Sequence, residues 1–111
     1  MITTHVLDLS TGKPAAGVRV VLSSVVDAER KTIATGVTDA DGRLRDLVPA
    51  KTRVAAGTYE LAFETGAYFI ARKLAPFHPQ VVVSFEVTDE AQHYHVPLLI
   101  SPFGYTTYRG S

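Results

Sequence analysis

The feature of this sequence that most constrains its fold is a series of short apolar stretches separated by Gly, Pro and Asp. The clearest example is residues 57–64, where Tyr59, Leu61 and Phe63 alternate with small or polar residues. Successive side chains of a strand point to opposite faces, so one face of this segment is apolar and the other is mostly polar. This pattern is typical of a strand that buries one face in a core.

Seven other segments share the length and composition of strands. The complete set of expected strands is residues 2–9, 18–26, 32–38, 43–47, 57–64, 80–87, 93–101 and 105–109. Turn-forming residues lie between them, as at positions 39–42 with the sequence Asp-Ala-Asp-Gly. Residues 65–74 favour one or two helical turns that end before Pro76. Eight short strands and one short helix predict an all-β fold of two packed sheets, a β-sandwich.

Length and charge restrict the function classes. The 111 residues are close to the commonest domain size and contain no linker or repeat, so we expect residues 1–111 to form a single domain. Eleven basic and eleven acidic side chains cancel, which argues against a nucleic-acid partner or a polybasic membrane contact. No cysteine is present, so disulfides and a thiolate nucleophile are excluded. No apolar run is long enough to cross a bilayer and no export signal is visible, so the cytoplasm is the expected compartment.

The most informative segment is the expected strand at residues 93–101. One of its faces is uniformly apolar and is expected to join the core: Tyr94, Val96, Leu98 and Ile100. The opposite, outward face combines two histidines with apolar residues: His93, His95, Pro97 and Leu99. Such a face is unusual in water, and a second subunit is the simplest surface to cover it. Pro97 is unexpected inside a strand because it lacks a backbone donor.

Several interpretations of these polar residues remain open. His93 and His95 are either two half-buried strand histidines or part of a zinc site completed by His5 or His78. The Asp-Ala-Asp-Gly sequence at positions 39–42 resembles part of a calcium-binding loop, although the later ligands of such a loop are missing and a tight turn explains it. No Gly-x-Ser-x-Gly motif supports a serine nucleophile.

Four stretches of the chain resemble a known family. They are Thr-His-Val-Leu-Asp at residues 4–8, Gly-Lys-Pro-Ala at 12–15, Asp-Gly-Arg at 41–43, and the region from residue 93 to the final Tyr-Arg-Gly-Ser at 108–111. Together they resemble the 5-hydroxyisourate hydrolases of the transthyretin-like family, and the match spans essentially the whole chain. The closing Tyr-Arg-Gly-Ser is the most specific part, because it separates the hydrolases from the transthyretins, which carry hormones on the same fold.

The resemblance implies a fold, an assembly and a reaction. The fold is a transthyretin-like sandwich of two four-stranded sheets, assembled as a homotetramer with sites in channels between pairs of subunits. The reaction is the hydrolysis of 5-hydroxyisourate to 2-oxo-4-hydroxy-4-carboxy-5-ureidoimidazoline in urate degradation, without a metal or other cofactor. The implied catalytic residues are His5, Arg43 and His95, and the implied substrate-binding residues are Tyr108, Arg109, Gly110 and Ser111.

The chemistry of these residue types agrees with that reaction. Histidine exchanges protons near neutral pH, so His5 or His95 is expected to act as general base or acid. Arg43 is always charged and is expected to stabilise negative charge on a carbonyl oxygen and to lower the pKa of a neighbouring histidine. Two other classes stay as alternatives: a transthyretin-type carrier of a small aromatic ligand, and a structural β-sandwich module. A carrier needs no acid–base pair, and a module is expected to have linkers and a solvated outer face.

Overall fold

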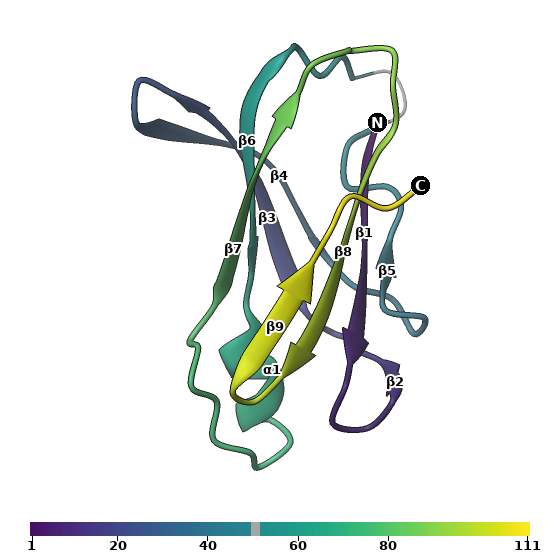
Figure 1. Cartoon of the computed structure of the whole chain (residues 1–111), viewed down its shortest axis with the longest axis vertical. Helices are drawn as coiled ribbons and strands as arrows, with labels where there is room; N and C mark the ends of the chain where they lie inside the picture. The colour runs from purple at the N-terminus through teal and green to yellow at the C-terminus, as the bar shows by residue number, and fades with distance from the viewer. Residues whose placement is uncertain (50–51) are drawn as a thin grey trace.

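A computed structural model of the chain describes residues 1–49 and 52–111 and consists of two β-sheets and one short helix (Figure 1). The elements in chain order are β1 (Ile2–Asp8), β2 (Lys13–Pro14), β3 (Arg19–Val26), β4 (Glu29–Val37), β5 (Arg43–Leu44), β6 (Gly57–Phe63), α1 (Thr65–Ile70), β7 (Val81–Val87), β8 (Tyr94–Ser101) and β9 (Gly104–Thr107). The predicted all-β sandwich is confirmed.

One sheet has the strand order β4-β3-β6-β7 and is antiparallel throughout. The other has the order β2-β1-β8-β9, and β5 also pairs with β1. Within this second sheet β1 and β8 run parallel, whereas the other pairs are antiparallel. The parallel pair matters for function, because it places the start of the chain beside the histidine-bearing start of β8.

The core lies between the sheets and follows the expected alternation. On β6 the residues that the sequence assigned to the core are buried: Tyr59, Leu61 and Phe63. On β8 the predicted core face is buried as well: Tyr94, Val96, Leu98 and Ile100. The assignment of the two faces of each strand is therefore confirmed.

The helix α1 covers only the first six residues of the predicted segment 65–74 and ends at Ile70. Lys73 has a left-handed φ of 62°, and the Leu74 N–H donates to the Phe69 carbonyl at 3.1 Å. A tight turn at residues 71–73 therefore follows the helix, and the chain leaves the helical conformation before Pro76, as expected. Within the described residues, no helix is long and apolar enough to span a membrane.

Several strands differ from the expected ranges. The strand β5 ends at Leu44 rather than at residue 47, and β9 ends at Thr107 rather than at residue 109. The strand β4 begins at Glu29 rather than at residue 32, because Asp27 and Ala28, with φ values of 50° and 65°, form a tight two-residue connection to β3. The two-residue strand β2 was not expected, since residues 10–14 have the composition of a turn. It pairs with the end of β1 and gives the second sheet one more strand than the predicted four-stranded form.

Candidate active site

A hollow of about 320 Å³ lies on the outer face of the five-stranded sheet. Its lining combines polar and apolar side chains from β1, β5, β8 and the C-terminal segment: His5, Leu7, Arg43, His95, Pro97, Leu99, Tyr108, Gly110 and Ser111. It brings together the three residues predicted to be catalytic and three of the four predicted to bind substrate. Arg109 is the one predicted site residue that lies elsewhere.

His5 reaches the hollow because β1 alternates strictly between the two faces of the sheet. Val6 and Asp8 are buried on the inner face, whereas His5 and Leu7 are half-buried on the outer face. The His5 Nε2 atom lies 3.0 Å from the carbonyl oxygen of Asp41. A carbonyl oxygen only accepts hydrogen bonds, so Nε2 carries the proton and Nδ1 is the basic nitrogen of neutral His5.

Arg43 is held opposite His5 by the turn that precedes β5. Arg43 and His5 are direct partners in the β1–β5 register. The turn is fixed by Asp39, whose Oδ1 accepts the backbone N–H groups of Asp41 and Arg43, both at 2.9 Å. Gly42 has a left-handed φ of 73°, and a Cβ there would lie 2.3 Å from the Val6 carbonyl oxygen, so only glycine lets the turn approach β1 this closely.

His95 lies on β8 and is half-buried. Its Nδ1 atom is 2.8 Å from the hydroxyl oxygen of Thr3, the residue opposite it in the parallel β1–β8 register. The same hydroxyl is 2.8 Å from His93 Nε2. Within the described part of the chain, His95 Nε2 has no hydrogen-bond partner. Thr3 was not among the predicted site residues. It lies two residues before His5 on β1, and therefore on the same face of that strand.

The environment of His95 favours the neutral imidazole. Burial lowers the pKa of His95 below its usual value, and the charge of Arg43 lowers this pKa further, as do His93 and His5 when they are protonated. The predicted influence of Arg43 on a neighbouring histidine therefore has the expected direction, with burial as the larger cause. A neutral His95 has a free lone pair and can accept a proton from water.

The C-terminal segment forms one wall of the hollow. The Gly110 N–H donates to the His95 carbonyl at 2.8 Å, and a Cβ on Gly110 would lie only 2.5 Å from Cδ2 of the His95 ring. The segment also covers Pro97, which is buried within the chain itself. Within one chain the C-terminal segment therefore already covers Pro97, one of the residues for which the sequence suggested a second subunit.

Pro97 occupies a gap in the pairing between β8 and β9. The ladder runs from Ser101–Gly104 to Leu98–Thr107, and an isolated bridge resumes the same register at His95–Gly110. The missing N–H of proline coincides with the unpaired stretch between them. The Thr107 hydroxyl nevertheless donates to the Pro97 carbonyl at 2.8 Å.

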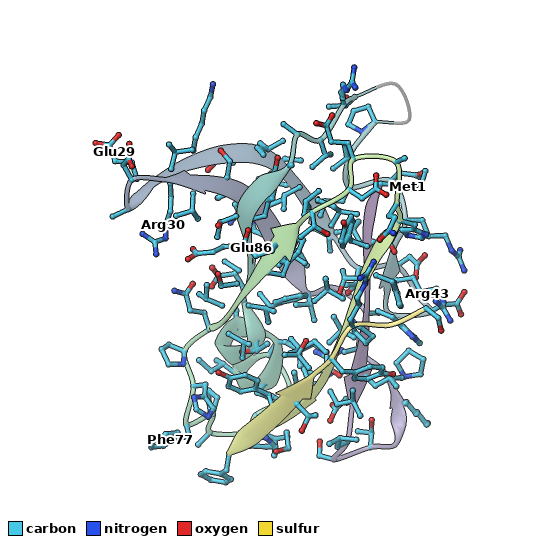
Figure 2. The ribbon with its side chains drawn as sticks, turned by 45° about the horizontal axis from the view of Figure 1, so that its top comes forward. Met1, Glu29, Arg30, Arg43, Phe77 and Glu86 are labelled. Carbon is cyan, nitrogen blue, oxygen red and sulfur yellow. The ribbon has the colours of Figure 1, made fainter. Side chains whose placement is uncertain are left out.

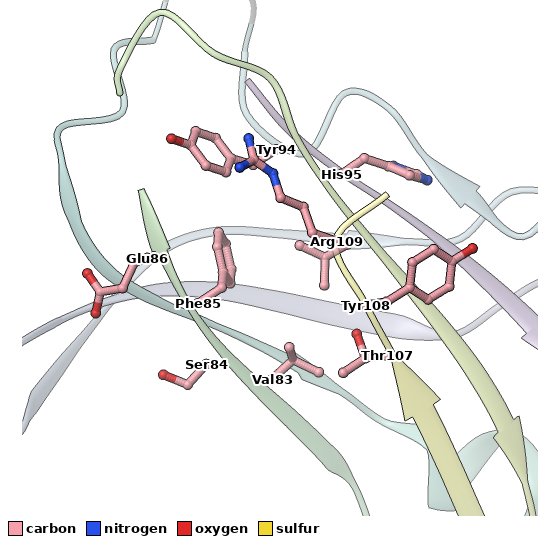
Figure 3. A pocket seen from close by; sticks show the side chains of 10 residues that line it. Val83, Ser84, Phe85, Glu86, Tyr94, His95, Thr107, Tyr108 and Arg109 are labelled. Atoms are coloured by element: carbon pink, nitrogen blue, oxygen red, sulfur yellow. The ribbon is translucent and has the colours of Figure 1, made fainter. Parts of the chain in front are cut away.

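Arg109, predicted to bind substrate, points away from the hollow that His5 and His95 line (Figure 3). Its guanidinium carbon lies 4.6 Å from the centre of the Tyr94 ring, and its Nη2 donates to Gln92 Oε1 at 2.9 Å. Figure 3 shows Arg109 directed toward Tyr94, while His95 projects to the other side of β8. In the single chain Arg109 lines a second hollow, between β7 and the C-terminal segment.

The two metal alternatives find no support in the geometry. Among residues 1–49 and 52–111, no three His, Asp or Glu side chains form a group that could hold a metal ion. His78 packs edge-on against Phe77 and Tyr105, and Phe77 lies far from Arg43 (Figure 2). The Asp39 carboxylate caps backbone N–H groups, as a tight turn requires.

Comparisons with known proteins cover nearly the entire chain. Residues 2–110 match the model of the HIUase/Transthyretin family. A 5-hydroxyisourate hydrolase from Salmonella dublin is 48% identical, over 100% of this chain and 81% of its own. A second 5-hydroxyisourate hydrolase, from Halalkalibacterium halodurans, is 46% identical over 99% of this chain and 97% of its own.

Solved structures of a 5-hydroxyisourate hydrolase and of a transthyretin share the fold of this chain. The 5-hydroxyisourate hydrolase of Klebsiella pneumoniae superposes with a TM-score of 0.86 and 42% identity, covering 99% of this chain and 98% of its own. Sea bream transthyretin in complex with thyroxine superposes with a TM-score of 0.91 and 37% identity, covering 98% and 93%. The backbone therefore does not separate the enzyme from the carrier, and the side chains of the hollow must do so.

Proposed function

Since the chain belongs to the HIUase/Transthyretin family, we propose that it is a hydrolase that opens 5-hydroxyisourate to 2-oxo-4-hydroxy-4-carboxy-5-ureidoimidazoline. The observation that carries this proposal is the convergence of His5, Arg43 and His95 on one hollow. A carrier needs apolar walls and a few polar anchors, but it has no use for a neutral histidine beside a fixed positive charge.

The bond to be broken is a cyclic amide, in which an acyl carbon is joined to a ring nitrogen. Water must lose a proton as its oxygen attacks that carbon, and the carbonyl oxygen gains negative charge. The carbon–nitrogen bond then breaks, the electron pair stays on nitrogen, and nitrogen takes up a proton. The site must therefore supply a base, a positive charge and an acid.

His95 fits the role of the base. Its Nδ1 is occupied by Thr3 at 2.8 Å, so Nε2 is the nitrogen available to water. The lowered pKa of His95, caused first by burial and then by Arg43, keeps the imidazole neutral near pH 7. The proton accepted at Nε2 can return to the leaving nitrogen from the same atom.

Arg43 fits the role of the oxyanion partner. Among the hydrogen bonds and ion pairs of the described residues, none involves its guanidinium, which lines the hollow together with His95. Two parallel N–H groups of arginine match the oxygens of a planar imide-like ring. Because Arg43 supplies a positive charge, this mechanism needs no metal ion.

His5 completes the site on the β1 side. With Nε2–H donated to Asp41, its Nδ1 is the atom that remains for substrate. We propose that His5 accepts a hydrogen bond from a ring N–H, or exchanges the second proton of the reaction. We also propose that the protein assembles as a homotetramer, in which a neighbouring subunit closes the hollow into a channel.

The test of the proposed function is a direct assay. Uricase acting on urate generates 5-hydroxyisourate in place, and its absorbance decay is followed with and without micromolar protein. We expect decay well above the spontaneous rate, unchanged after exhaustive chelation. Equal decay curves with and without the protein would contradict the hydrolase and favour a carrier, whereas loss on chelation with recovery on zinc addition would contradict the metal-free mechanism.

A further inference from the structure

The hydroxyl of Thr3 links the half-buried His95 to the exposed His93. It lies 2.8 Å from His95 Nδ1 and 2.8 Å from His93 Nε2. Thr3 is only 7% exposed, so water does not easily replace either contact. His93 itself is exposed, just before β8 begins at Tyr94. The three groups form a continuous path from the hollow to solvent.

The number of protons on this path restricts its states. A threonine hydroxyl has one proton to donate and accepts through its lone pairs. When it bridges two imidazole nitrogens, it therefore donates to one and accepts from the other. If His95 Nδ1–H donates to Thr3, then Thr3 donates to His93 Nε2; the reverse order requires a proton on His93 Nε2 and none on His95 Nδ1. The tautomers of the two histidines are thus coupled.

The coupled tautomers allow a positive charge to leave His95. Once His95 accepts a proton from water, a positive charge appears in a half-buried ring that shares the hollow with Arg43 and His5. Moving that charge to exposed His93 places it in water, where it is better solvated. The two short contacts through Thr3 provide the route without any movement of the backbone.

We propose that Thr3 and His93 are positioning residues that form a proton relay behind His95. This inference rests on the proposed function and adds to it a route for the positive charge. Before the reaction, His95 Nδ1–H donates to Thr3, which leaves Nε2 as the base. When Nε2 takes a proton from water, the Nδ1 proton moves to Thr3, and the Thr3 proton moves to His93 Nε2. His95 becomes neutral again with its proton on Nε2, ready for the leaving nitrogen, and the relay then reverses.

The substitution that tests the relay is Thr3→Val, which keeps the shape of the side chain and removes the hydroxyl. We expect kcat to fall about tenfold to a hundredfold, with KM changed less than twofold, because the base loses its charge route and not its contact with substrate. Thr3→Ser restores a hydroxyl and should return kcat to within a few fold of the parent. A serine variant as slow as the valine variant would overturn the role of the hydroxyl.

The matched control is Thr4→Val. Thr4 is the next residue of β1, faces the core, and donates its hydroxyl to the Val96 carbonyl at 2.6 Å. The same atoms are removed, but no histidine is contacted. We expect lower thermal stability and an unchanged kcat per folded molecule. A loss of kcat equal to that of Thr3→Val would show that the effect belongs to β1 in general and would overturn the proposal.

His93→Gln tests the far end of the relay without disturbing the core, because His93 is exposed. Glutamine keeps a hydrogen-bonding side chain but cannot hold the positive charge. We expect a drop in kcat similar to that of Thr3→Val and no further drop in the double variant, as residues that act as a unit are not additive. An unchanged kcat in His93→Gln would overturn the relay even if Thr3→Val failed to fold.

Nitrogen-15 NMR of the histidines gives a readout that does not depend on activity. At a pH where both rings are neutral, we expect His95 in the parent to carry its proton on Nδ1 and to lose this preference in Thr3→Val. A parent His95 protonated on Nε2, or the same tautomer in both proteins, would overturn the proposal. Because this measurement uses no substrate, failure of the relay is distinguishable from failure of the hydrolase assignment.

Discussion

The two ring nitrogens of His95 have different surroundings, and this difference defines what the side chain can do. Nδ1 is held by Thr3 at 2.8 Å, and Nε2 is the nitrogen left for chemistry. His95→Asn keeps a polar side chain but removes the base, so we expect turnover to fall by roughly two to four powers of ten. The matched control is His78→Asn, since His78 packs on Tyr105 away from the hollow. Equal activities of the two variants would contradict the proposed role of His95.

The lowered pKa of His95 predicts a pH dependence of definite sign. Burial and the charge of Arg43 place this pKa below the ordinary histidine value of 6.5. Because protonated His95 cannot act as a base, we expect kcat/KM to fall only below pH 6.5. The unfolded chain binds this proton more readily than the folded one. The stability contributed by His95 is therefore present above pH 6.5 and is lost as pH falls through its folded-state pKa. An NMR titration of His95 with a midpoint above 6.5 would contradict both statements.

Gly110 is required by contact rather than by backbone conformation. A Cβ at this position would lie 2.5 Å from Cδ2 of His95 and 3.1 Å from Cγ of Pro97. We expect Gly110→Ala to displace the His95 ring or the C-terminal wall and to lower kcat by about 10²-fold, while stability changes by less than about 1 kcal/mol. Gly104→Ala is the control, because its nearest neighbour is Ser101 Oγ at 3.8 Å. Comparable kcat values for the two variants would show that the close approach has no functional role.

Single residues of the site were predictable from sequence to different degrees. Alternation along a strand and the family resemblance together pointed to His5, Arg43 and His95, because all three lie on short regular segments or a turn with a clear signature. Arg109 was assigned to the site with its neighbours by the resemblance, although alternation with Tyr108 and Gly110 places its side chain on the opposite face. Thr3 was missed because a threonine in a strand is common, and only the register with β8 reveals its partner.

At the scale of elements, one face of β8 packs in the core and the other face lines the candidate site. Val96 is 5% exposed and packs in the core, whereas His95 next to it lines the hollow. We expect Val96→Ala to lower the free energy of unfolding by about 2 kcal/mol, from lost burial and the cavity left behind. The folded fraction should keep the parent kcat. A variant of parent stability and reduced kcat would mean that the faces are assigned in reverse.

Strand boundaries were less predictable than strand faces, for reasons visible at two places. The connection between β3 and β4 uses Asp27 and Ala28 with positive φ, and alanine gives no signal for such a turn. The strand β2 has two residues, and its pairing depends on the return of the chain along β1. Neither a local pattern nor a propensity contains this information. The faces of β6 and β8, in contrast, could be predicted, because the burial of one face repeats at every second residue along each strand.

At the scale of the whole molecule, the sandwich itself was predictable because the central strands β1, β3, β6 and β8 each bury one face, and no helix among the described residues is long enough to bury a separate core. The assembly was not. Pro97 on the outward face of β8 was one reason to expect a second subunit, but the chain's own C-terminal segment covers Pro97. Gly110 packs against Pro97, whereas Leu99 on the same face stays half-buried. Apolar composition on an outer face predicts a cover but does not identify it.

The edges of the two sheets also favour assembly with a second copy of the chain. β7 and β9 are the outer strands of their respective sheets, and one hollow is lined by residues of both β7 and the C-terminal segment. Open edges favour pairing with another chain. Large apolar side chains are also exposed on and beside these strands: Val82, Phe103 and Tyr105. These features agree with a second copy that continues the sheets.

Light scattering tests the homotetramer directly, and dilution links it to function. We expect a mass four times the 12.0 kDa of one chain at working concentration. His5, Arg43 and His95 already converge within one chain, so separation of subunits should open the hollow to water rather than remove its catalytic groups. Activity per chain should therefore fall together with the mass on dilution, through a rise in KM more than a loss of kcat. A 12.0 kDa species with full activity would contradict both the assembly and its proposed role in closing the site.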